Sequence, residues 1–588
     1  MTQDQVASKA DLSIVSFEQP YRSARRWMRS ERWYGFLCIA ITLACVLAAN
    51  PFCGIGFNDD WSYAHVALKF AQTGHVHYNG WGPAMQLFQI TWAGEWIRRF
   101  GFSFDFLRII TLPFSLGFVG LVYGLGRKAG LRTDLACFAA LLVGTSPLYI
   151  PLAGSFMTEP YSCFFTALCL YAAMSCVEAT GTRTAIVWLW VLTLSGLIGG
   201  ADRQTVWVAP LALIPYAFLS RRGERVFWWH AAAAYVACVS CIGFLAIRFT
   251  QPYPGLELPK EHAVSMLLQN LAPGSGKLVG LLLTCAQVLL PALLCFVPFW
   301  RKLKRSEIAA LLSASGALVL VSICSGAGAA PFAGSVLSGY GVLLRGAEGL
   351  GYRPELLSPL LRIAISVLIA FSGLFVMSGK AKHDSMRRAP RTVFAIFCFA
   401  YVPLLVPGAI TGFVHDRYVL PLAPVLAIFV LHRFQSQRRA VPKLAWALIA
   451  LLAIYGMVIT HDYASAARGR ARAAEALERM GVSREHVSAG LEYDGWTALE
   501  AGSSIRPLRY GDHIEWNATN VFWFWDRVPA VHPDYVAVTA RASDAADGVL
   551  PRIAFTAWTP PFRRAVIVRK REHLPKTQIC TTGLPCFL

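Results

Sequence analysis

Long apolar runs separated by short polar segments dominate this chain. A helix needs about 20 mostly apolar residues to cross a bilayer, and the chain contains thirteen runs of that kind, several of them short. The runs lie at 34–50, 106–126, 134–150, 155–176, 185–200, 204–219, 227–248, 278–299, 307–326, 358–378, 392–410, 417–432 and 444–460. The pattern therefore predicts a polytopic α-helical membrane protein with about thirteen transmembrane helices.

The positions of the basic residues orient these spans. Lys and Arg gather in the N-terminal segment 1–33 and in every second connection, which is typical of cytoplasmic segments. The basic connections are 127–133, 177–184, 220–226, 300–306, 379–391 and 433–443. We therefore expect a cytoplasmic N-terminus. The loops 51–105, 249–277 and 327–357 and the tail 461–588 are expected on the opposite, extracytoplasmic side.

The tail 461–588 has the pattern of a separate soluble domain. It begins with a helical stretch, AARGRARAAEALERMG, and continues with strand-like runs such as YVAVTA and RAVIVRK. This order predicts a small α+β domain. Cys580 and Cys586 lie in the tail and are a candidate disulfide, because an extracytoplasmic compartment is oxidising; two free thiols are the alternative. Region 327–357 carries no regular pattern and is predicted to be a loop.

Composition agrees with many membrane spans. The 588 residues are 55% hydrophobic and 15% charged, whereas soluble domains have about 25% charged residues. The net charge of +20 would suggest a nucleic-acid partner in a soluble protein. Here the basic residues form short clusters between apolar runs, which excludes nucleic acid as a partner. Polar residues precede the first apolar run, so we expect a retained span rather than a cleaved signal.

An acidic pair, Asp59 and Asp60, follows the first span in the stretch GFNDDWSYAHVALKF. The residues that follow have helical periodicity and a large apolar share, which predicts a helix in the membrane interface. Tyr63 shares a face with Asp59 through its i, i+4 spacing. A simpler interpretation is an N-cap. Successive helical residues point about 100° apart, so one carboxylate would cap or bind a cation while the other faces a cleft.

Two further charged positions lie on the same side of the membrane. Glu159, in the stretch GSFMTEPYSCFF, falls in a turn between two spans. An acid at membrane depth is costly and is a functional candidate, although it also suits a helix N-terminus. Arg203, in GGADRQTVW, opens a span. It is suited to bidentate phosphate binding; an arginine that extends to the interface is the alternative.

The last candidate group is GFVHDRYVLPLAP, at the outer start of a late span. It contains His415, Asp416, Arg417 and Tyr418. An internal Asp416–Arg417 pair is the simpler interpretation, and substrate binding by Arg417, His415 and Tyr418 is the functional one. With the sites above, it places acids and cations on one face of the membrane. Transfer from a lipid phosphate needs both, a base for the acceptor hydroxyl and cations for the leaving phosphate.

These motifs together resemble the GT-C glycosyltransferases. The features that carry the resemblance are the acidic pair after the first span, the Met-Thr-Glu-Pro turn, the basic residue opening a later span, Arg-Tyr-x-x-Pro and the extracytoplasmic tail. The branch most similar includes lipid A aminoarabinose transferases, protein O-mannosyltransferases and rhizobial lipopolysaccharide-core transferases. The tail stretch AGLEYDGW is similar to a recurring segment of poorly characterised members.

The resemblance implies a multi-pass enzyme of the cell inner (plasma) membrane. Its donor would be a polyprenyl-phosphate sugar, and its acceptor an envelope glycan or lipid rather than a protein. Asp59 or Asp60 would be the base of an inverting transfer, Glu159 the second acidic position and Arg203 the contact to the lipid phosphate. Relatives near the aminoarabinose transferases carry Lys-Pro-Pro in the first loop, whereas Tyr78–Gln86 reads YNGWGPAMQ here. This departure argues against aminoarabinose as the product.

Other interpretations and cofactors remain open at this point. A transporter or flippase of lipid-linked sugars would explain charges in the membrane, but such folds show internal repeats and broken helices near the midplane, and the sequence shows neither. A membrane sensor or scaffold would not need the acidic pair. Some relatives hold a metal, and His75, His77 and His262 lie on the same side, so the sequence leaves a divalent cation open as a cofactor.

Overall fold

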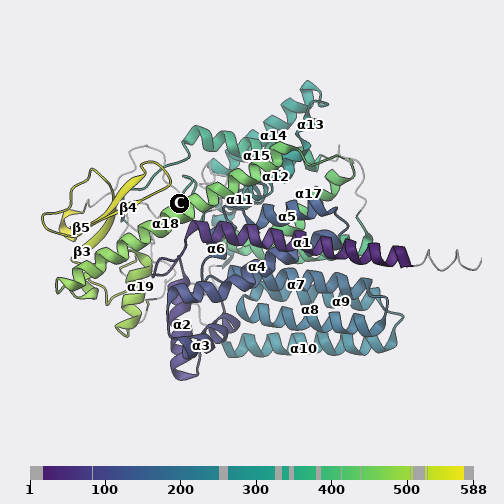
Figure 1. Cartoon of the computed structure of the whole chain (residues 1–588), viewed down its shortest axis with the longest axis horizontal. Coiled ribbons are helices and arrows are strands. Elements are labelled where there is room, and N and C mark those ends of the chain that lie inside the picture. Colours follow the sequence, from purple (N-terminus) through teal and green to yellow (C-terminus); the bar gives the residue numbers. More distant parts are fainter. Residues whose placement is uncertain are drawn as a thin grey trace, which may run out of the picture.

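The structure is a computed structural model that describes residues 18–82, 84–249, 263–324, 334–343, 350–378, 386–411, 414–437, 439–503, 505–506, 524–525 and 527–574. Long helices run side by side along its longest axis, and a small sheet lies at one end together with α2, α3 and α19 (Figure 1). The structure is thus a polytopic α-helical protein with a small sheet domain, as predicted. The candidate residues Cys580, Cys586 and His262 lie outside the described residues.

Most helices form the long bundle. They are α1 (Glu18–Ala49), α4 (Phe104–Lys128), α5 (Thr133–Gly144), α6 (Tyr149–Ala153), α7 (Glu159–Glu178), α8 (Thr182–Asp202), α9 (Val208–Ser220), α10 (Arg225–Phe249), α11 (Ala263–Val288), α12 (Leu290–Leu293), α13 (Val297–Trp300), α14 (Arg305–Cys324), α15 (Pro359–Met377), α16 (Arg388–Thr411), α17 (Ala423–Gln435) and α18 (Lys443–Arg479). Large apolar side chains lie on their outer surfaces, such as Leu360 and Phe399, which are 80% and 82% exposed. Exposed apolar surface on this scale suits contact with lipid rather than water.

The helices coincide with the predicted spans one by one. Within the described residues, eight are long and apolar enough to cross a membrane, and a bent pair, 276–288 with 290–300, adds a ninth. Four shorter apolar helices, 33–49, 133–144, 204–220 and 423–435, match the remaining predictions. The predicted span 134–150 instead ends at Gly144, because Pro147 disfavours helical geometry in the residue before it.

The sheet domain is built mainly from the tail. Its strands are β1 (Leu350–Gly351), β2 (Val487–Ser488), β3 (Tyr535–Arg541), β4 (Arg552–Thr556) and β5 (Arg563–Lys570). Strands β3, β5 and β4 are antiparallel neighbours, and β1 and β2 each pair parallel with β3. The runs YVAVTA and RAVIVRK form β3 and β5, as predicted. Region 327–357 is more than a loop, since β1 comes from it and joins the tail sheet.

The last membrane helix and the tail are continuous. Helix α18 is 37 residues long and runs from the predicted span 444–460 into the tail without a break. The strands β4 and β5 pack against its C-terminal half, and Gly469 allows close approach, because an added Cβ there would lie 2.8 Å from Val566. The predicted domain boundary at 460 therefore falls inside a continuous helix and is not a flexible linker.

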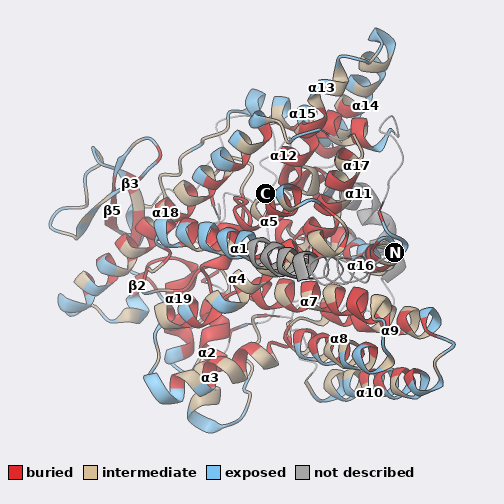
Figure 2. Ribbon diagram, turned by 45° about the vertical axis from the view of Figure 1, so that its right-hand side comes forward, coloured by how far each residue is buried: buried red, intermediate tan, exposed pale blue. Residues whose placement is uncertain are grey.

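The first loop also belongs to this end of the molecule. It forms α2 (Asp60–Thr73) and α3 (Leu87–Phe100), and tail helix α19 (Leu491–Glu500) packs on α2. Trp496 stacks on Phe102 at 4.9 Å between ring centroids and lies edge-on to His65. Buried residues continue from the bundle into α2 and α19 (Figure 2). The predicted helix thus exists, but the tail covers it: residues 60–67 are buried.

Substituting Gly495 tests this docking. An added Cβ at Gly495 would lie 2.6 Å from the Trp61 ring. The fully buried Trp61 cannot turn away, because Trp81 and Phe524 pack against it. Gly495→Ala should destabilise the protein by about 1–3 kcal/mol, measured by denaturant unfolding of the detergent-solubilised chain. Gly243→Ala, in a helix with nothing within 4 Å of the added Cβ, is the control; equal stability of the two variants would contradict tight docking.

Candidate active site

Asp59 lies at the start of α2 and points into a cluster of charged side chains. Its Oδ1 accepts a hydrogen bond of 2.9 Å from Trp81 Nε1, and its Oδ2 accepts one of 3.1 Å from Arg417 Nη2. Asp59 does not cap α2 with its side chain. The Asp59 side chain is 17% exposed, so it is the more accessible carboxylate of the acidic pair.

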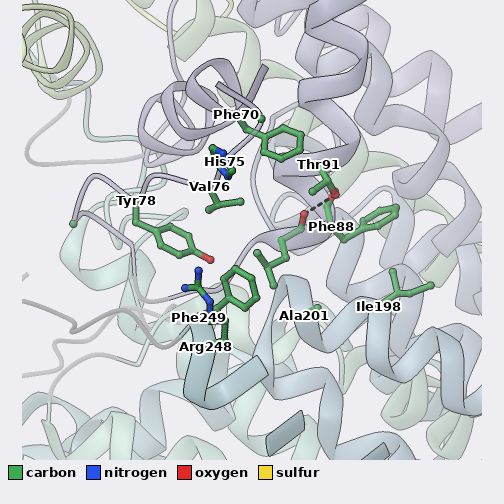
Figure 3. Close-up of a pocket in the computed structure, with 13 residues that line it drawn as sticks. Phe70, His75, Val76, Tyr78, Phe88, Thr91, Ile198, Ala201, Arg248 and Phe249 are labelled. Atoms are coloured by element: carbon green, nitrogen blue, oxygen red, sulfur yellow. Dashed lines mark hydrogen bonds between the residues drawn. The ribbon is translucent and has the colours of Figure 1, made fainter. Parts of the chain in front are cut away.

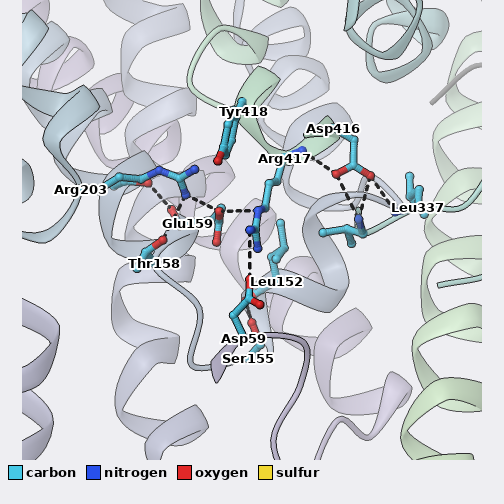
Figure 4. Close-up of polar contacts among 12 residues, drawn as sticks. Asp59, Leu152, Ser155, Thr158, Glu159, Arg203, Leu337, Asp416, Arg417 and Tyr418 are labelled. Carbon is cyan, nitrogen blue, oxygen red and sulfur yellow. Dashed lines mark hydrogen bonds and ion pairs between the residues drawn. The ribbon is translucent and has the colours of Figure 1, made fainter. Parts of the chain in front are cut away.

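Glu159, the first residue of α7, lies at the centre of the cluster. Its Oε1 accepts a hydrogen bond from Arg203 and lies 3.3 Å from Nε of Arg417. Arg203 Nη1 also donates to Thr158 Oγ1 at 3.1 Å. A chain of alternating charges thus runs from Asp59 through Arg417 and Glu159 to Arg203 (Figure 4). These residues come from four segments that are far apart in the sequence.

The cluster is buried, but two of its polar atoms lack hydrogen-bond partners. The side chains of Glu159 and Arg417 are 2% and 9% exposed. Glu159 Oε2 and Arg417 Nη1 nevertheless have no hydrogen-bond partner within the described residues. Such groups are costly unless they are paired. The arrangement therefore offers one free acceptor and one free donor to a bound ligand.

Asp60 has a different environment from Asp59. It is fully buried. Its oxygens accept N–H bonds from Phe57 at 2.5 Å and Phe156 at 3.2 Å, and Arg108 lies 4.0 Å away. Burial raises the pKa of Asp60 to about 7, although the Arg108 charge and the N–H bonds oppose the shift. A pKa near neutrality suits a base, but a base must first reach its proton. Asp60 instead joins the first loop to the segment before α7.

The aromatic candidates lie close to the charged cluster. The guanidinium of Arg203 lies 4.7 Å from the Tyr418 ring centroid, and the His415 ring lies 5.4 Å from the same ring. Burial, together with the charges of Arg417 and Arg203, lowers the pKa of His415 to about 3, so this histidine is neutral. Burial and the nearby Asp59 raise the pKa of Tyr63 well above its ordinary value. Both rings are thus neutral groups beside the charges.

Asp416 does not pair with the neighbouring guanidinium. Its carboxylate accepts backbone N–H bonds from Val336, Leu337 and Arg417 at 2.7–3.1 Å. The simpler interpretation of this motif, an internal Asp416–Arg417 side-chain pair, is therefore wrong. The bonds fix the 3-10 turn Asp416–Val419 against segment 334–337. Arg417 is left to bridge Asp59 and Glu159.

Sequence reasoning missed two residues of this region. Trp81 donates to Asp59, and it lies in the stretch YNGWGPAMQ, whose sequence signal is the absent lysine. Asp202 is fully buried, and its Oδ1 accepts the Gln89 N–H at 3.1 Å, which ties α3 to the end of α8. The position of Asp202 inside GGADRQ, next to Arg203, could have marked it as a candidate from the sequence.

A cavity of about 820 Å³ lies beside the first loop. Apolar side chains such as Phe70, Phe88 and Ile198 form much of its wall, with Tyr78 and Arg248 at one side (Figure 3). The Tyr78 hydroxyl donates to the Met85 carbonyl at 2.5 Å. Ala201 also lines the cavity, two residues before Arg203 on the same segment. An apolar chain with a polar end suits such a space.

No metal centre is formed by the part of the chain that the structure describes. No three of its His, Cys, Asp and Glu side chains come together in a way that could hold an ion. His75 and His77 lie near each other, with ring centroids 6.4 Å apart. The cation left open by the sequence therefore gains no support from these residues.

Comparisons with known proteins give distant structural neighbours. No family model and no curated protein matches the chain. ArnT from Cupriavidus metallidurans, solved in the apo state and bound to undecaprenyl phosphate, matches with 11% identity and a TM-score of 0.37. These matches cover 92% and 90% of this chain and 98% and 97% of ArnT.

A second neighbour is the Archaeoglobus fulgidus oligosaccharyltransferase tethered with an acceptor peptide. It matches with 15% identity and a TM-score of 0.41, over 85% of this chain and 64% of that one. Both neighbours are members of the GT-C superfamily, which the sequence resembles. Because both TM-scores are below 0.5, the case for function rests on the residues of the site.

Proposed function

We propose that this chain is a GT-C type membrane glycosyltransferase that moves a sugar from a polyprenyl-phosphate donor to an acceptor hydroxyl outside the cytoplasm. The observation that carries the proposal is the buried chain Asp59–Arg417–Glu159–Arg203, with an unpaired donor on Arg417 and an unpaired acceptor on Glu159. Cations and a carboxylate are thus held next to one another, as transfer from a phosphate requires. The acceptor class that we propose is an envelope glycan or lipid.

Each charged residue has a role in this reaction. Arg203 and Arg417 bind the donor phosphate, and Glu159 holds both guanidinium groups in place. The acceptor oxygen attacks the anomeric carbon while the bond from that carbon to the phosphate oxygen breaks, through an oxocarbenium-like state. The acceptor proton moves to Asp59, and the phosphate leaves on the lipid. A single displacement of this kind inverts the configuration of the sugar.

Neighbouring groups complete the proposed site. Tyr418 supports the Arg203 guanidinium from its ring face, and the neutral His415 and Tyr63 offer hydrogen bonds to the sugar without adding charge. The apolar cavity that Ala201 helps to line suits the first isoprene units of the donor. We place the enzyme in the cell inner membrane, with the N-terminus cytoplasmic and the tail periplasmic.

The test is an assay of the purified full-length protein with a radiolabelled polyprenyl-phosphate sugar. Release or transfer of the sugar is expected. A transporter or flippase would move the intact lipid-linked sugar across proteoliposomes and leave the sugar–phosphate bond unbroken, and that outcome alone would overturn the proposal. Comparing membrane glycolipids with and without the gene by mass spectrometry then identifies the sugar and the acceptor.

Arg203→Lys should weaken donor binding. Lysine keeps the charge but loses the planar fork that contacts Glu159 and Thr158 and the flat group that lies on Tyr418. We expect the KM for the donor to rise about tenfold, the value of one charged hydrogen bond, with a smaller change in kcat. Steady-state kinetics checks this. Arg183→Lys, at the exposed far end of α8, is the control, and an unchanged KM in Arg203→Lys would remove Arg203 from the donor site.

A further inference from the structure

A second cavity, of about 530 Å³, is strongly basic. It lies where the outer half of α18 meets β4 and β5. Its walls include Arg468, Arg472, Arg552, Arg563 and Arg564, and no acidic residue lines it. Five guanidinium groups around one cavity repel one another unless an anion lies between them. This concentration of charge is separate from the candidate active site.

The existing partners of these arginines leave most of the charge uncompensated. Arg468 donates to the carbonyls of Asn50 and Phe52 at 3.1 and 2.9 Å. Arg468 also donates to the Ser465 hydroxyl at 2.9 Å, and Arg552 donates to the carbonyls of Asp544 and Ala542. Arg564 approaches a carboxylate, with Nη1 3.6 Å from Asp462 Oδ2. Carbonyl oxygens accept the hydrogen bonds but cancel no charge.

Two guanidinium groups are free to bind a ligand. Arg472, on α18, and Arg563, on β5, are exposed. Neither side chain makes a hydrogen bond or an ion pair with any residue that the structure describes. They line the same cavity from two different elements, α18 and β5. A phosphate group between them would receive the bidentate contacts that arginine makes best.

The cavity begins at the membrane surface. His461 lines it and directly follows the predicted span 444–460. Trp558 stacks on His461, with ring centroids 4.0 Å apart and planes 9° apart. Trp558 and the neighbouring Phe562 are 45% and 60% exposed, as is typical of aromatic residues at the lipid–water boundary. Arg472 lies three turns beyond His461, roughly 16 Å along the helix, so the cavity extends outward from the headgroup level.

We propose that this basic cavity binds the phosphate groups of an anionic membrane lipid. The exposed aromatic residues contact the acyl region, and Arg472 and Arg563 hold the phosphate from two sides. The lipid enters from the leaflet on the side of the first loop, because Arg468 connects the cavity to the carbonyls of Asn50 and Phe52 at the start of that loop. This inference does not depend on the proposed glycosyl transfer.

The test measures lipid binding to the purified full-length chain. Native mass spectrometry in detergent should show a phosphatidic acid adduct and a much weaker phosphatidylcholine adduct. The double variant Arg472→Ala/Arg563→Ala should weaken phosphatidic acid binding at least tenfold, since each charged contact contributes about that factor. Arg479→Ala, an exposed residue of the same helix outside the cavity, should bind as the unmodified protein does.

Two results would overturn the proposal. One is equal phosphatidic acid binding by the double variant and by Arg479→Ala. The other is displacement of the lipid by inorganic phosphate at the same concentration as the lipid itself, which would assign the cavity to a free anion. Because both substituted arginines are exposed and unpaired, thermal unfolding should be unchanged, and this measurement confirms that loss of binding is not loss of fold.

Discussion

Asp59→Asn should lower kcat by about 10²–10⁴-fold, the usual contribution of general-base catalysis. Asparagine can still accept the Trp81 N–H bond with its oxygen, but its amide nitrogen can neither accept the Arg417 bond nor take the acceptor proton. The loss should appear in kcat with donor in excess, because the arginines that we assign to the phosphate remain. Initial rates of sugar transfer by the purified variant measure it, and chromatography in detergent reports whether the bundle is intact.

Asp60→Asn is the matched control for this prediction. Asp60 is the neighbouring acid, yet both of its oxygens are bound to backbone N–H groups. In Asp60→Asn the side-chain amide N–H would point toward a backbone N–H group, so we expect a lower stability of the protein. The kcat of the folded fraction should stay within a few-fold of the kcat of the unmodified protein. Normal turnover in Asp59→Asn, or a larger loss of kcat in Asp60→Asn than in Asp59→Asn, would contradict the choice of Asp59.

The bundle could be predicted because its signal is local. Each span is a continuous apolar run, and the alternation of basic connections constrains the whole series. Proline set the limits of this prediction: the span predicted at 134–150 ends at Gly144, and the span predicted at 278–299 exists as two helices bent by 67° next to Pro291, a broken helix that the sequence pattern did not predict. Strand β1 could not be predicted, because two residues carry no periodicity and its partner β3 lies far along the chain.

The residues of the site could be predicted from the sequence, but the contacts between them could not. Sequence spacing marked Asp59, Glu159, Arg203 and Arg417 individually, yet each had a simple local explanation. Tertiary packing pairs Arg417 with Asp59 across 358 positions, and no local pattern records such a pair. The same limit hid the role of the tail, in which Glu492 accepts a hydrogen bond from Tyr463, whose ring packs edge-on against Phe57, two residues before Asp59.

Arg417→Gln is the second substitution for which we expect a large loss of activity. Arg417 contacts both carboxylates of the cluster, and its free Nη1 is the donor that we assign to the phosphate. Removing one preorganised donor to a developing charge typically lowers the rate by about 10²–10³-fold, and we expect that loss in kcat/KM for the donor. Exposed Arg99→Gln, which removes the same charge elsewhere, should leave kcat/KM unchanged.

A structural role for Arg417 predicts a different result. Glu159 keeps Arg203 and Asp59 keeps Trp81, so the stability cost of Arg417→Gln should stay below the 3–5 kcal/mol of a fully broken buried pair. If Arg417 acts only by holding Asp59, adding Arg417→Gln to Asp59→Asn should cost nothing further, because residues that act as one unit are not additive. Phosphate binding by Arg417 instead requires a further loss in the double variant, expressed as a higher KM for the donor.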